Sequence, residues 1–266
     1  MGIIDIHCHA FPDSLAPRAI AALTSAGEWT SVGDGTTTGL LASMDAAGIE
    51  ASVLCPIATK PSMFDGICGW LASLESPRLI PFGSIHPNDE DRPGLVARLA
   101  ETGIRGVKMH AFYQDFCVDD PQMDDYYAAL AEHDMLIQFH AGHDIAFEED
   151  AILDRSAPHR IAAVLDRHPT LKVLATHTGG WKVWDEVREH LLGRRVLLET
   201  SYTTPFLPAD QHAELIRAHG LDNVAFGTDW PWMDQAAELE TLRGLGLTDD
   251  EFRQVTEHPA AAWLGL

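Results

Sequence analysis

The chain has 266 residues, 46% of them hydrophobic, a composition typical of a folded globular protein rather than a disordered one. Its 40 Asp and Glu residues outnumber 18 Lys and Arg residues, and a net charge of −22 repels phosphate backbones and anionic lipids, so neither nucleic acid nor membranes are expected as partners. No apolar run approaches the roughly 20 residues of a membrane helix, and no secretory signal is recognisable, so we expect a cytoplasmic protein that acts on a small molecule.

The amino-terminal segment carries the first candidate metal ligands. Ile3 and Ile4 predict a short strand, and Asp5, His7 and His9 follow at alternate positions, so that in an extended strand they point the same way. Two neighbouring imidazoles are half of a divalent-metal site, although paired histidines on a strand are often only packed and hydrogen-bonded. Asp5 lies deeper, where we expect it to hydrogen-bond within the barrel floor and orient the ligands rather than coordinate directly.

The rest of the chain alternates between predicted helices and strands. Helices are expected over 15–24, 39–47, 62–74, 92–101, 124–132, 158–167, 182–192, 209–219, 235–245 and 249–258, and strands over 51–56, 78–86, 104–110, 135–140, 171–177, 196–200 and 223–229. Thr37 or Thr38 is expected to cap the helix that begins at Gly39 and that Gly48 ends. The apolar tail 260–266 is expected to dock on the barrel.

These eight strand-helix units follow one another without a linker-like break, which favours a parallel sheet with right-handed crossovers. The length is close to the ~250 residues of an eight-stranded β/α barrel. An open doubly wound sheet has the same alternation, but no Gly-x-Gly-x-x-Gly loop follows the first strand. We therefore expect an α/β fold, a (β/α)8 TIM barrel that spans residues 1–266 as one domain.

Ligand-type residues recur where the predicted strands end. His140, His177 and Asp229 each close an apolar run. Because the carboxyl ends of the strands of a closed barrel meet at one rim, these residues are expected at a common site. A site made of three of these imidazoles and one carboxylate suits Zn²⁺ or a similar divalent ion, and it leaves one coordination position for water.

In this order, the motifs resemble the metal-dependent amidohydrolase superfamily, specifically the compact amidohydrolase-related branch that contains aminocarboxymuconate-semialdehyde decarboxylase. The resemblance covers essentially the whole chain. It rests on Asp5-x-His7-x-His9, Gly106-Val107-Lys108-Met109-His110, His140-Ala141-Gly142, His177-Thr178-Gly179-Gly180, Gly227-Thr228-Asp229-Trp230-Pro231 and the closing residues 259–266. It implies that His7, His9, His140 and Asp229 hold one metal ion per chain, expected to be Zn²⁺, which would lower the pKa of its bound water toward ~7.

The roles of three residues stay open at this point. In a one-metal site His177 resembles the acid/base histidine of the family, whereas in a two-metal site it would ligate the second ion. Asp229 could take a proton from the water as well as contact the metal. Lys108 could be carboxylated and bridge two metals, remain an ammonium that binds an anionic substrate group, or form a structural ion pair.

Other residues are candidates for the substrate pocket. His110 shares a face with Lys108, and His86 ends the third predicted strand. His143, with Asp144, follows His140 closely. Trp230 and Trp232 could wall the pocket or pack against the last helix. The histidines expected on the surface are His133, His159, His168, His190, His212, His219 and His258.

The sequence thus predicts a metal-dependent hydrolase that uses metal-activated water to attack the carbonyl of a small amide, ester or lactone. The alternative is a metal-dependent decarboxylase, a carbon-carbon lyase that acts on a small aromatic or unsaturated carboxylic acid, because one ligand set serves both reactions. A catalytically silent binding protein is a third reading, but all four ligand-type residues are present. A homodimer is an open expectation, since the outer helices of such barrels often pair.

Overall fold

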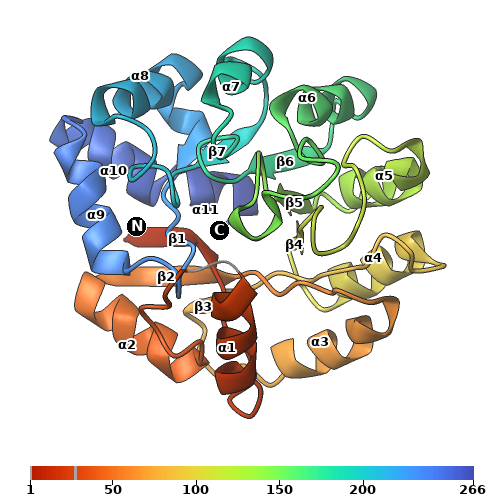
Figure 1. Ribbon diagram of the computed structural model, residues 1–266. Helices are drawn as coiled ribbons and strands as arrows, with labels where there is room; N and C mark the ends of the chain where they lie inside the picture. The colour runs from red at the N-terminus through yellow and green to blue at the C-terminus, as the bar shows by residue number, and fades with distance from the viewer. Residues whose placement is uncertain (1, 27–28) are drawn as a thin grey trace.

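The computed structural model describes residues 2–26 and 29–266, in which eight strands form a central wall surrounded by helices (Figure 1). The strands are β1 Ile3–Cys8, β2 Ile49–Leu54, β3 Leu79–Pro81, β4 Gly106–Met109, β5 Leu136–Phe139, β6 Lys172–Ala175, β7 Leu197–Glu199 and β8 Val224–Ala225. Most are shorter than predicted, and His9, His140, His177 and Asp229 lie beyond the ends of their strands.

The helices follow the predicted order. They are α1 Ala16–Ala26, α2 Thr37–Ala47, α3 Phe64–Leu71, α4 Arg92–Glu101, α5 Asp124–Glu132, α6 Pro158–Arg167, α7 Trp184–His190, α8 Ala209–His219, α9 Gln235–Gly244, α10 Asp249–Glu257 and α11 Pro259–Leu264. Short 3-10 helices cover Pro61–Met63, Pro121–Met123, Ile145–Phe147 and Leu221–Asn223. Within the described residues, no helix is both long enough and apolar enough to cross a membrane.

The strands close into a barrel. They form two parallel sheets in sequence order, β1 to β3 and β4 to β8. At one seam the Gly83 N–H donates to the Gly106 carbonyl at 2.8 Å, and at the other the Ile6 N–H donates to the Phe226 carbonyl at 3.0 Å. These bonds join the sheets into a ring of eight strands, which confirms the predicted single-domain TIM barrel.

Strand β1 does not keep the simple alternation that its sequence suggests. Asp5 pairs with Ser52 and Cys8 with Leu54, so three steps along β1 match two steps along β2. Asp5 itself faces outward, where its carboxylate accepts a hydrogen bond from Gln235 of α9 at 2.8 Å, and the bulge that follows it turns His7 toward the cavity. The prediction that Asp5 shares a face with His7 and lies in the barrel floor is therefore wrong, because the extra residue re-aims the side chains that follow it.

Apolar side chains fill the lower barrel, and α11 closes it. The interior cluster comprises Ile4, Ile6, Val53, Cys55, Phe82, Leu136, Leu174, Leu197 and Ala225, with Ala260, Ala261 and Leu264 of α11. The space is tight, since a Cβ atom at Gly106 would lie 2.5 Å from the Phe82 ring. The carboxyl-terminal tail thus docks as predicted, at the end of the barrel opposite the ligand-type residues.

Helix α2 begins earlier than its sequence suggested. Thr36, and not Thr37 or Thr38, is the cap, because its Oγ1 accepts a hydrogen bond from the Gly39 N–H at 2.9 Å. Gly48 ends the helix as predicted, in a left-handed conformation with φ of 71°.

Two histidines expected on the surface are buried. His212 is 1% exposed, and its Nε2 lies 2.9 Å from Thr178 Oγ1. His219 is 4% exposed, and its Nε2 donates to the Val196 carbonyl at 2.9 Å. Both lie on the face of α8 that packs against the barrel, so the prediction was wrong because it treated the whole helix as exposed.

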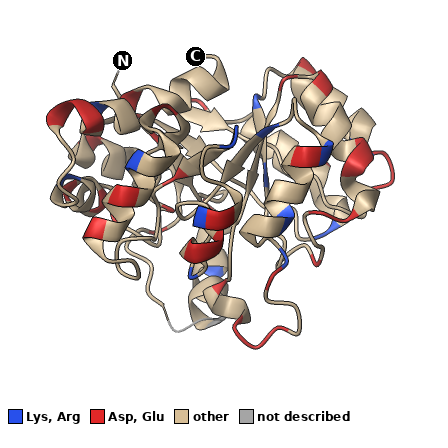
Figure 2. Cartoon of the chain, turned by 90° about the horizontal axis from the view of Figure 1, so that it is seen from above, with Lys and Arg blue, Asp and Glu red and all other residues tan. Residues whose placement is uncertain are grey.

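The acidic surface residues are distributed around the outer helices and loops (Figure 2).

Candidate functional site

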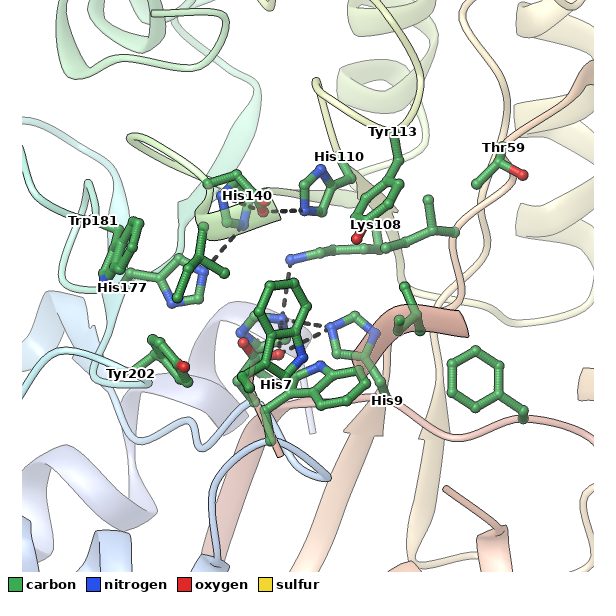
Figure 3. A pocket seen from close by; sticks show the side chains of 18 residues that line it. His7, His9, Thr59, Lys108, His110, Tyr113, His140, His177, Trp181 and Tyr202 are labelled. Carbon is green, nitrogen blue, oxygen red and sulfur yellow. Dashed lines mark hydrogen bonds and ion pairs between the residues drawn. The ribbon is translucent and has the colours of Figure 1, made fainter. Parts of the chain in front are cut away.

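The ligand-type residues meet at the carboxyl ends of the strands, as predicted. Figure 3 shows the side chains of His7, His9, Lys108, His140 and His177 pointing toward a common centre, and Asp229 lies within 3.4 Å of both His7 and His9. They come from five parts of the wall: His7 and His9 from the end of β1, Lys108 from β4, and His140, His177 and Asp229 from just beyond β5, β6 and β8. Residues distant in sequence therefore supply one site.

Three donor atoms form a small triangle at this centre. The Nε2 atoms of His7 and His9 are 3.1 Å apart, and Asp229 Oδ1 lies 3.4 Å from the first and 3.1 Å from the second. Ligands about 2.0–2.2 Å from a tetrahedral metal ion lie roughly 3.3 Å from one another. The triangle therefore has the dimensions of one face of a metal-coordination tetrahedron.

The outer nitrogens of His7 and His9 show which way these rings are protonated. His9 Nδ1 lies 2.8 Å from the Cys55 carbonyl, and His7 Nδ1 lies 3.1 Å from Glu199 Oε1. Both partners accept, so each Nδ1 carries the proton and each Nε2 keeps its lone pair. Two lone pairs and a carboxylate oxygen thus face one another, an arrangement that a cation would stabilise.

His177 and His140 extend the same pattern. His177 Nδ1 lies 3.2 Å from the Ser201 carbonyl, and His140 Nε2 lies 2.9 Å from the His143 carbonyl. Their inner atoms, His177 Nε2 and His140 Nδ1, are then both lone-pair atoms, and they lie 3.2 Å apart. Four imidazoles therefore turn acceptor nitrogens inward.

This donor set fits a divalent metal ion. Potential ligand atoms of His7, His177 and Asp229 lie within 4.8 Å of one another, and His9 contacts both His7 and Asp229. His140 was predicted as a ligand. Its Nδ1 contacts His177 Nε2 and none of the three atoms of the His7, His9 and Asp229 triangle. The residues that would hold the ion are therefore His7, His9 and Asp229, with an imidazole from beyond β5 or β6 as the fourth.

Burial and neighbouring charges keep these groups in ligand-competent protonation states. Burial lowers the pKa of His7 and His140 well below the usual histidine value, and lowers the pKa of His177 as well. Burial would raise the pKa of Asp229, but the adjacent His7 and His9 outweigh it and hold that pKa far below the usual range. Neutral imidazoles and an ionised carboxylate are the forms that bind metal.

Lys108 lies at the same centre with its amine fully buried. Its Nζ is 3.1 Å from His7 Nε2, and among residues 2–26 and 29–266 no carboxylate lies within ion-pair distance of it. Burial lowers the pKa of Lys108, while Cys55, Asp229 and Glu199 oppose that shift. The structure thus offers no partner for the structural ion pair considered from the sequence.

A second group of titratable side chains adjoins the first. His110 Nε2 and His140 Nε2 lie 3.2 Å and 3.4 Å from Asp144 Oδ2, and the two rings stack at 4.1 Å. The amide N–H of Ala146 occupies the other oxygen of Asp144 at 2.7 Å. Asp144 therefore orients two pocket histidines at once.

The backbone at the site is locally strained. His177, Thr178 and Asp229 have positive φ values of 58°, 52° and 64°, a region that residues with a Cβ atom rarely occupy. Such conformations cost about 1–3 kcal/mol each and persist where the surrounding structure holds them. The geometry of His177 and Asp229 is therefore imposed by the fold.

A cavity of about 230 Å³ opens above this centre. It is lined by His7, His9, Phe11, Leu23, Trp29, Ile57, Thr59, Lys108, His110, Tyr113, His140, Asp144, Ile145, His177, Trp181, Tyr202, Asp229 and Trp232. Aromatic rings from several loops form much of its wall. Pockets for drug-sized ligands span about 300–1,000 Å³, so this cavity suits a smaller molecule.

The residues predicted from the sequence to line the substrate pocket fall into two groups, those that line this cavity and those that do not. Lys108 and His110 line the cavity, whereas His86, His143 and Trp230 are not part of its lining among the described residues. The His86 Nδ1 accepts from the Asn88 N–H at 3.1 Å, away from the centre. The ring of Trp230 lies against Gly33, where a Cβ atom would come within 2.4 Å of it. Trp232 takes the wall position instead.

Sequence reasoning missed Glu199. This residue ends β7, is fully buried, and contacts His7 and the backbone of His177. The available signal was an acidic residue closing the apolar run Val196-Leu197-Leu198, the same pattern that singled out His140 and Asp229.

Solved structures share this fold at low sequence identity. An uncharacterized TIM-barrel protein from Bordetella bronchiseptica is 19% identical with a TM-score of 0.75, and 99% of each chain is covered. A 5-carboxyvanillate decarboxylase from Novosphingobium aromaticivorans, with bound manganese and 3-methoxy-4-hydroxy-5-nitrobenzoic acid, is 15% identical with a TM-score of 0.70, covering 99% of this chain and 97% of that one. A probable 2-pyrone-4,6-dicarboxylic acid hydrolase from Acinetobacter baumannii, with citric acid bound, is 14% identical with a TM-score of 0.68, covering 100% of both.

No curated protein matches the chain in sequence. The family model described as Amidohydrolase (Amidohydro_2) matches residues 4–266, which is nearly the whole chain. With a closed barrel and a metal-type donor cluster at its carboxyl rim, the chain belongs to the Amidohydro_2 family of amidohydrolases.

Proposed function

We propose that this protein is a metal-dependent decarboxylase that releases CO2 from a small aromatic or unsaturated monocarboxylic acid. The observation that carries the proposal is a centre of inward-facing imidazole lone pairs and one carboxylate beneath an aromatic-walled cavity, with the Lys108 amine beside it. A planar substrate ring can pack against the aromatic walls, and the substrate carboxylate can bind at the centre formed by the metal ion and Lys108.

The similar structures support the same reading. Besides the 5-carboxyvanillate decarboxylase, they include a 2,6-dihydroxybenzoate decarboxylase from Rhizobium. The proposal also agrees with the resemblance to the branch that contains aminocarboxymuconate-semialdehyde decarboxylase. We propose one ion per chain, zinc by the chemistry of the donor set, with manganese as the competing metal because one similar decarboxylase binds it.

The charges of the lining favour a single carboxylate on the substrate. Among the described lining residues, Lys108 is the one lysine or arginine, and it stands against the carboxylates of Asp144 and Asp229. A substrate with a second carboxylate would have to bury that charge beside an acidic residue, at a cost in affinity. We therefore expect monocarboxylates to react better than dicarboxylates.

Each residue has a distinct role in this proposal. When bound, a divalent ion supplies positive charge to substrate oxygens and, in a hydrolase, lowers the pKa of a water. Lys108 donates hydrogen bonds to the carboxylate. The bond from ring carbon to carboxylate breaks, its electron pair stays on the carbon, and that carbon takes up a proton as CO2 leaves. His177 relays this proton: Ser201 holds its Nδ1, so the free Nε2 takes a proton from solvent in the cavity and passes it to the carbon, while Asp229 stays ionised.

The test is a comparison of two substrate panels. Protein stripped with a chelator and reloaded with Zn²⁺ or Mn²⁺ is incubated in D2O with a panel of hydroxybenzoates and, separately, with a panel of small lactones, amides and esters. Products are followed by chromatography and NMR. We expect metal-dependent CO2 release, deuterium at the carbon that lost the carboxylate, and loss of activity in His7→Ala. If the wild-type protein binds no metal and none of the acids react, the proposal fails.

Hydrolysis of a small lactone, amide or ester is the second candidate. It is favoured by the probable 2-pyrone-4,6-dicarboxylic acid hydrolase among the similar structures and by a donor cluster that would also serve water activation. In the same experiment, metal-dependent opening of a lactone without CO2 release from any acid would select this candidate.

A further inference from the structure

The carboxylate of Glu199 lies between two histidines of the candidate metal centre. Its Oε1 accepts from His7 Nδ1 at 3.1 Å, from the His177 N–H at 2.9 Å and from the Ser201 hydroxyl at 2.7 Å. Its Oε2 accepts from the Ser201 N–H at 2.7 Å. One fully buried side chain thus receives four donors from three strand ends.

Ser201 connects the Glu199 carboxylate to His177. Because the Ser201 hydroxyl donates its proton to Glu199, its oxygen is left as an acceptor, and it lies 3.0 Å from His177 Nδ1. The Ser201 carbonyl, 3.2 Å from the same nitrogen, is also an acceptor. His177 Nδ1 therefore keeps its proton, and its Nε2 keeps its lone pair.

The fold reserves room for this carboxylate at Gly227. A Cβ atom at that position would lie 2.3 Å from Glu199 Oε2 and 3.2 Å from His7 Cβ. Real side chains do not approach so closely, so any larger residue at position 227 would displace Glu199. The glycine at the end of β8 is thus part of the same arrangement.

We propose that Glu199 is a positioning residue that fixes the tautomers of His7 directly and of His177 through Ser201, so that His7 presents Nε2 to the metal ion and His177 keeps an unprotonated Nε2 facing the same centre. The inference rests on the metal site of the proposed function. It assigns separate consequences to the two branches. Losing Glu199 removes the nearer partner of His7 Nδ1 and the anchor of Ser201, whereas losing the Ser201 hydroxyl leaves Glu199 on His7 and removes only a more distant contact of 3.3 Å to that ring.

The isosteric variant Glu199→Gln tests the idea with little change in volume. An amide offers one acceptor oxygen where the carboxylate offers two, so its NH2 group must face either His7 Nδ1–H or the Ser201 N–H, both of which are donors. We expect affinity for Zn²⁺, measured by competition with a chelator, to fall about 10–100-fold, the usual effect of losing a partner behind a ligand.

The histidine tautomers provide a readout that does not need a substrate. In long-range ¹H–¹⁵N spectra of protein labelled with ¹⁵N-histidine, wild type should show His7 and His177 protonated at Nδ1, and Glu199→Gln should change both. Ser201→Ala should alter the His177 signals and leave Zn²⁺ affinity within about threefold, because Glu199 still accepts from His7 Nδ1 and the triangle of His7, His9 and Asp229 is untouched.

The matched control is Glu238→Gln. Glu238 is another buried carboxyl group, it makes no hydrogen bond to His7 or His177 in the described part of the chain, and burial raises its pKa to about 8. At neutral pH it already holds a proton, so the amide is a close mimic. Zn²⁺ affinity and histidine spectra should match the wild type.

The outcomes separate this inference from the proposed function. Unchanged tautomers and Zn²⁺ affinity in Glu199→Gln would overturn the inference while leaving the metal centre intact. Failure of the wild type to take up any metal would instead remove the proposed function, and the tautomers of the metal-free protein would still test the role of Glu199. If Glu199→Gln does not fold, Ser201→Ala still decides the branch to His177, because unchanged His177 signals would overturn it.

Discussion

At the scale of single residues, the site depends on which nitrogen of each imidazole carries the proton. The outer nitrogens of His7, His9, His140 and His177 face acceptors that are a carboxylate or backbone carbonyls. Each ring is thereby left with an inward lone pair, which is the state a metal ligand requires. A histidine-rich motif acquires metal chemistry only when such partners exist.

Lys108 offers a test of how the substrate is held. In Lys108→Met the stem is retained and the ammonium is lost, so a carboxylate substrate should lose a charged hydrogen bond worth about 1.5–3 kcal/mol, a rise in KM of about tenfold or more. Methyl esters of the same acids should compete equally well with both proteins in inhibition assays. An equal loss of affinity for acids and esters would contradict the proposed role, provided that the variant retains its metal.

The buried side chain of His212 makes the stability of the protein depend on pH. Burial lowers its pKa from 6.5 to about 4, so the unfolded chain binds this proton at a higher pH than the folded protein does. The resulting stabilisation, about 3 kcal/mol, is complete above about pH 6.5 and declines as the pH falls toward 4.

The variant His212→Gln should therefore lose less stability between pH 6.5 and pH 4 than the wild type, as measured by urea unfolding. His258→Gln, at an exposed histidine, is the control and should keep the wild-type dependence. Parallel stability curves for wild type and His212→Gln would show that His212 does not contribute.

At the scale of elements, strand ends build the site and α11 supports it from below. The apolar runs of β1, β4 and β5 ended near their predicted positions, which is why His7, Lys108 and His140 could be placed from sequence. That Asp5 and His7 face opposite ways could not be predicted, because the bulge in β1 depends on its register with β2. Trp230 was ambiguous for a similar reason: its packing depends on a loop near Gly33 that is distant in sequence.

Leu264 of α11 closes the barrel interior and is 3% exposed. Truncation in Leu264→Ala should lower the free energy of unfolding by about 2–5 kcal/mol, the range for a buried leucine. Leu266→Ala, at a side chain that is 52% exposed, should change it by less than about 0.5 kcal/mol. Metal content should remain unchanged in both variants, and an equal effect of the two truncations would mean that α11 does not seal the barrel.

At the scale of the whole molecule, the net charge is −22, and the acidic residues are spread around the outer helices and loops (Figure 2). Like charges at this density repel one another and destabilise the compact state. Added salt screens that repulsion, since the screening length falls from about 14 Å at 0.05 M to about 4 Å at 0.5 M.

We therefore expect the Tm to rise as NaCl increases from about 0.05 M to 0.5 M, measured by differential scanning fluorimetry. The metal-free protein in a chelating buffer should show the same trend, which separates screening from metal uptake. A falling Tm would mean that the surface ion pairs outweigh the excess acidic charge. The homodimer considered from the sequence stays a prediction, for which light scattering is the direct measurement.

The sequence by itself determined the barrel, the order of its strands and most candidate ligands, because hydrophobic periodicity and the residue that ends each strand are local properties. Only the tertiary structure decided that Glu199 and Asp144 each orient two histidines, that Asp5 faces α9, and that His86 and His143 lie outside the cavity lining. These facts depend on distances between strands far apart in the chain. A local pattern places a residue on a strand, but only the closed barrel determines which side chain lies next to it.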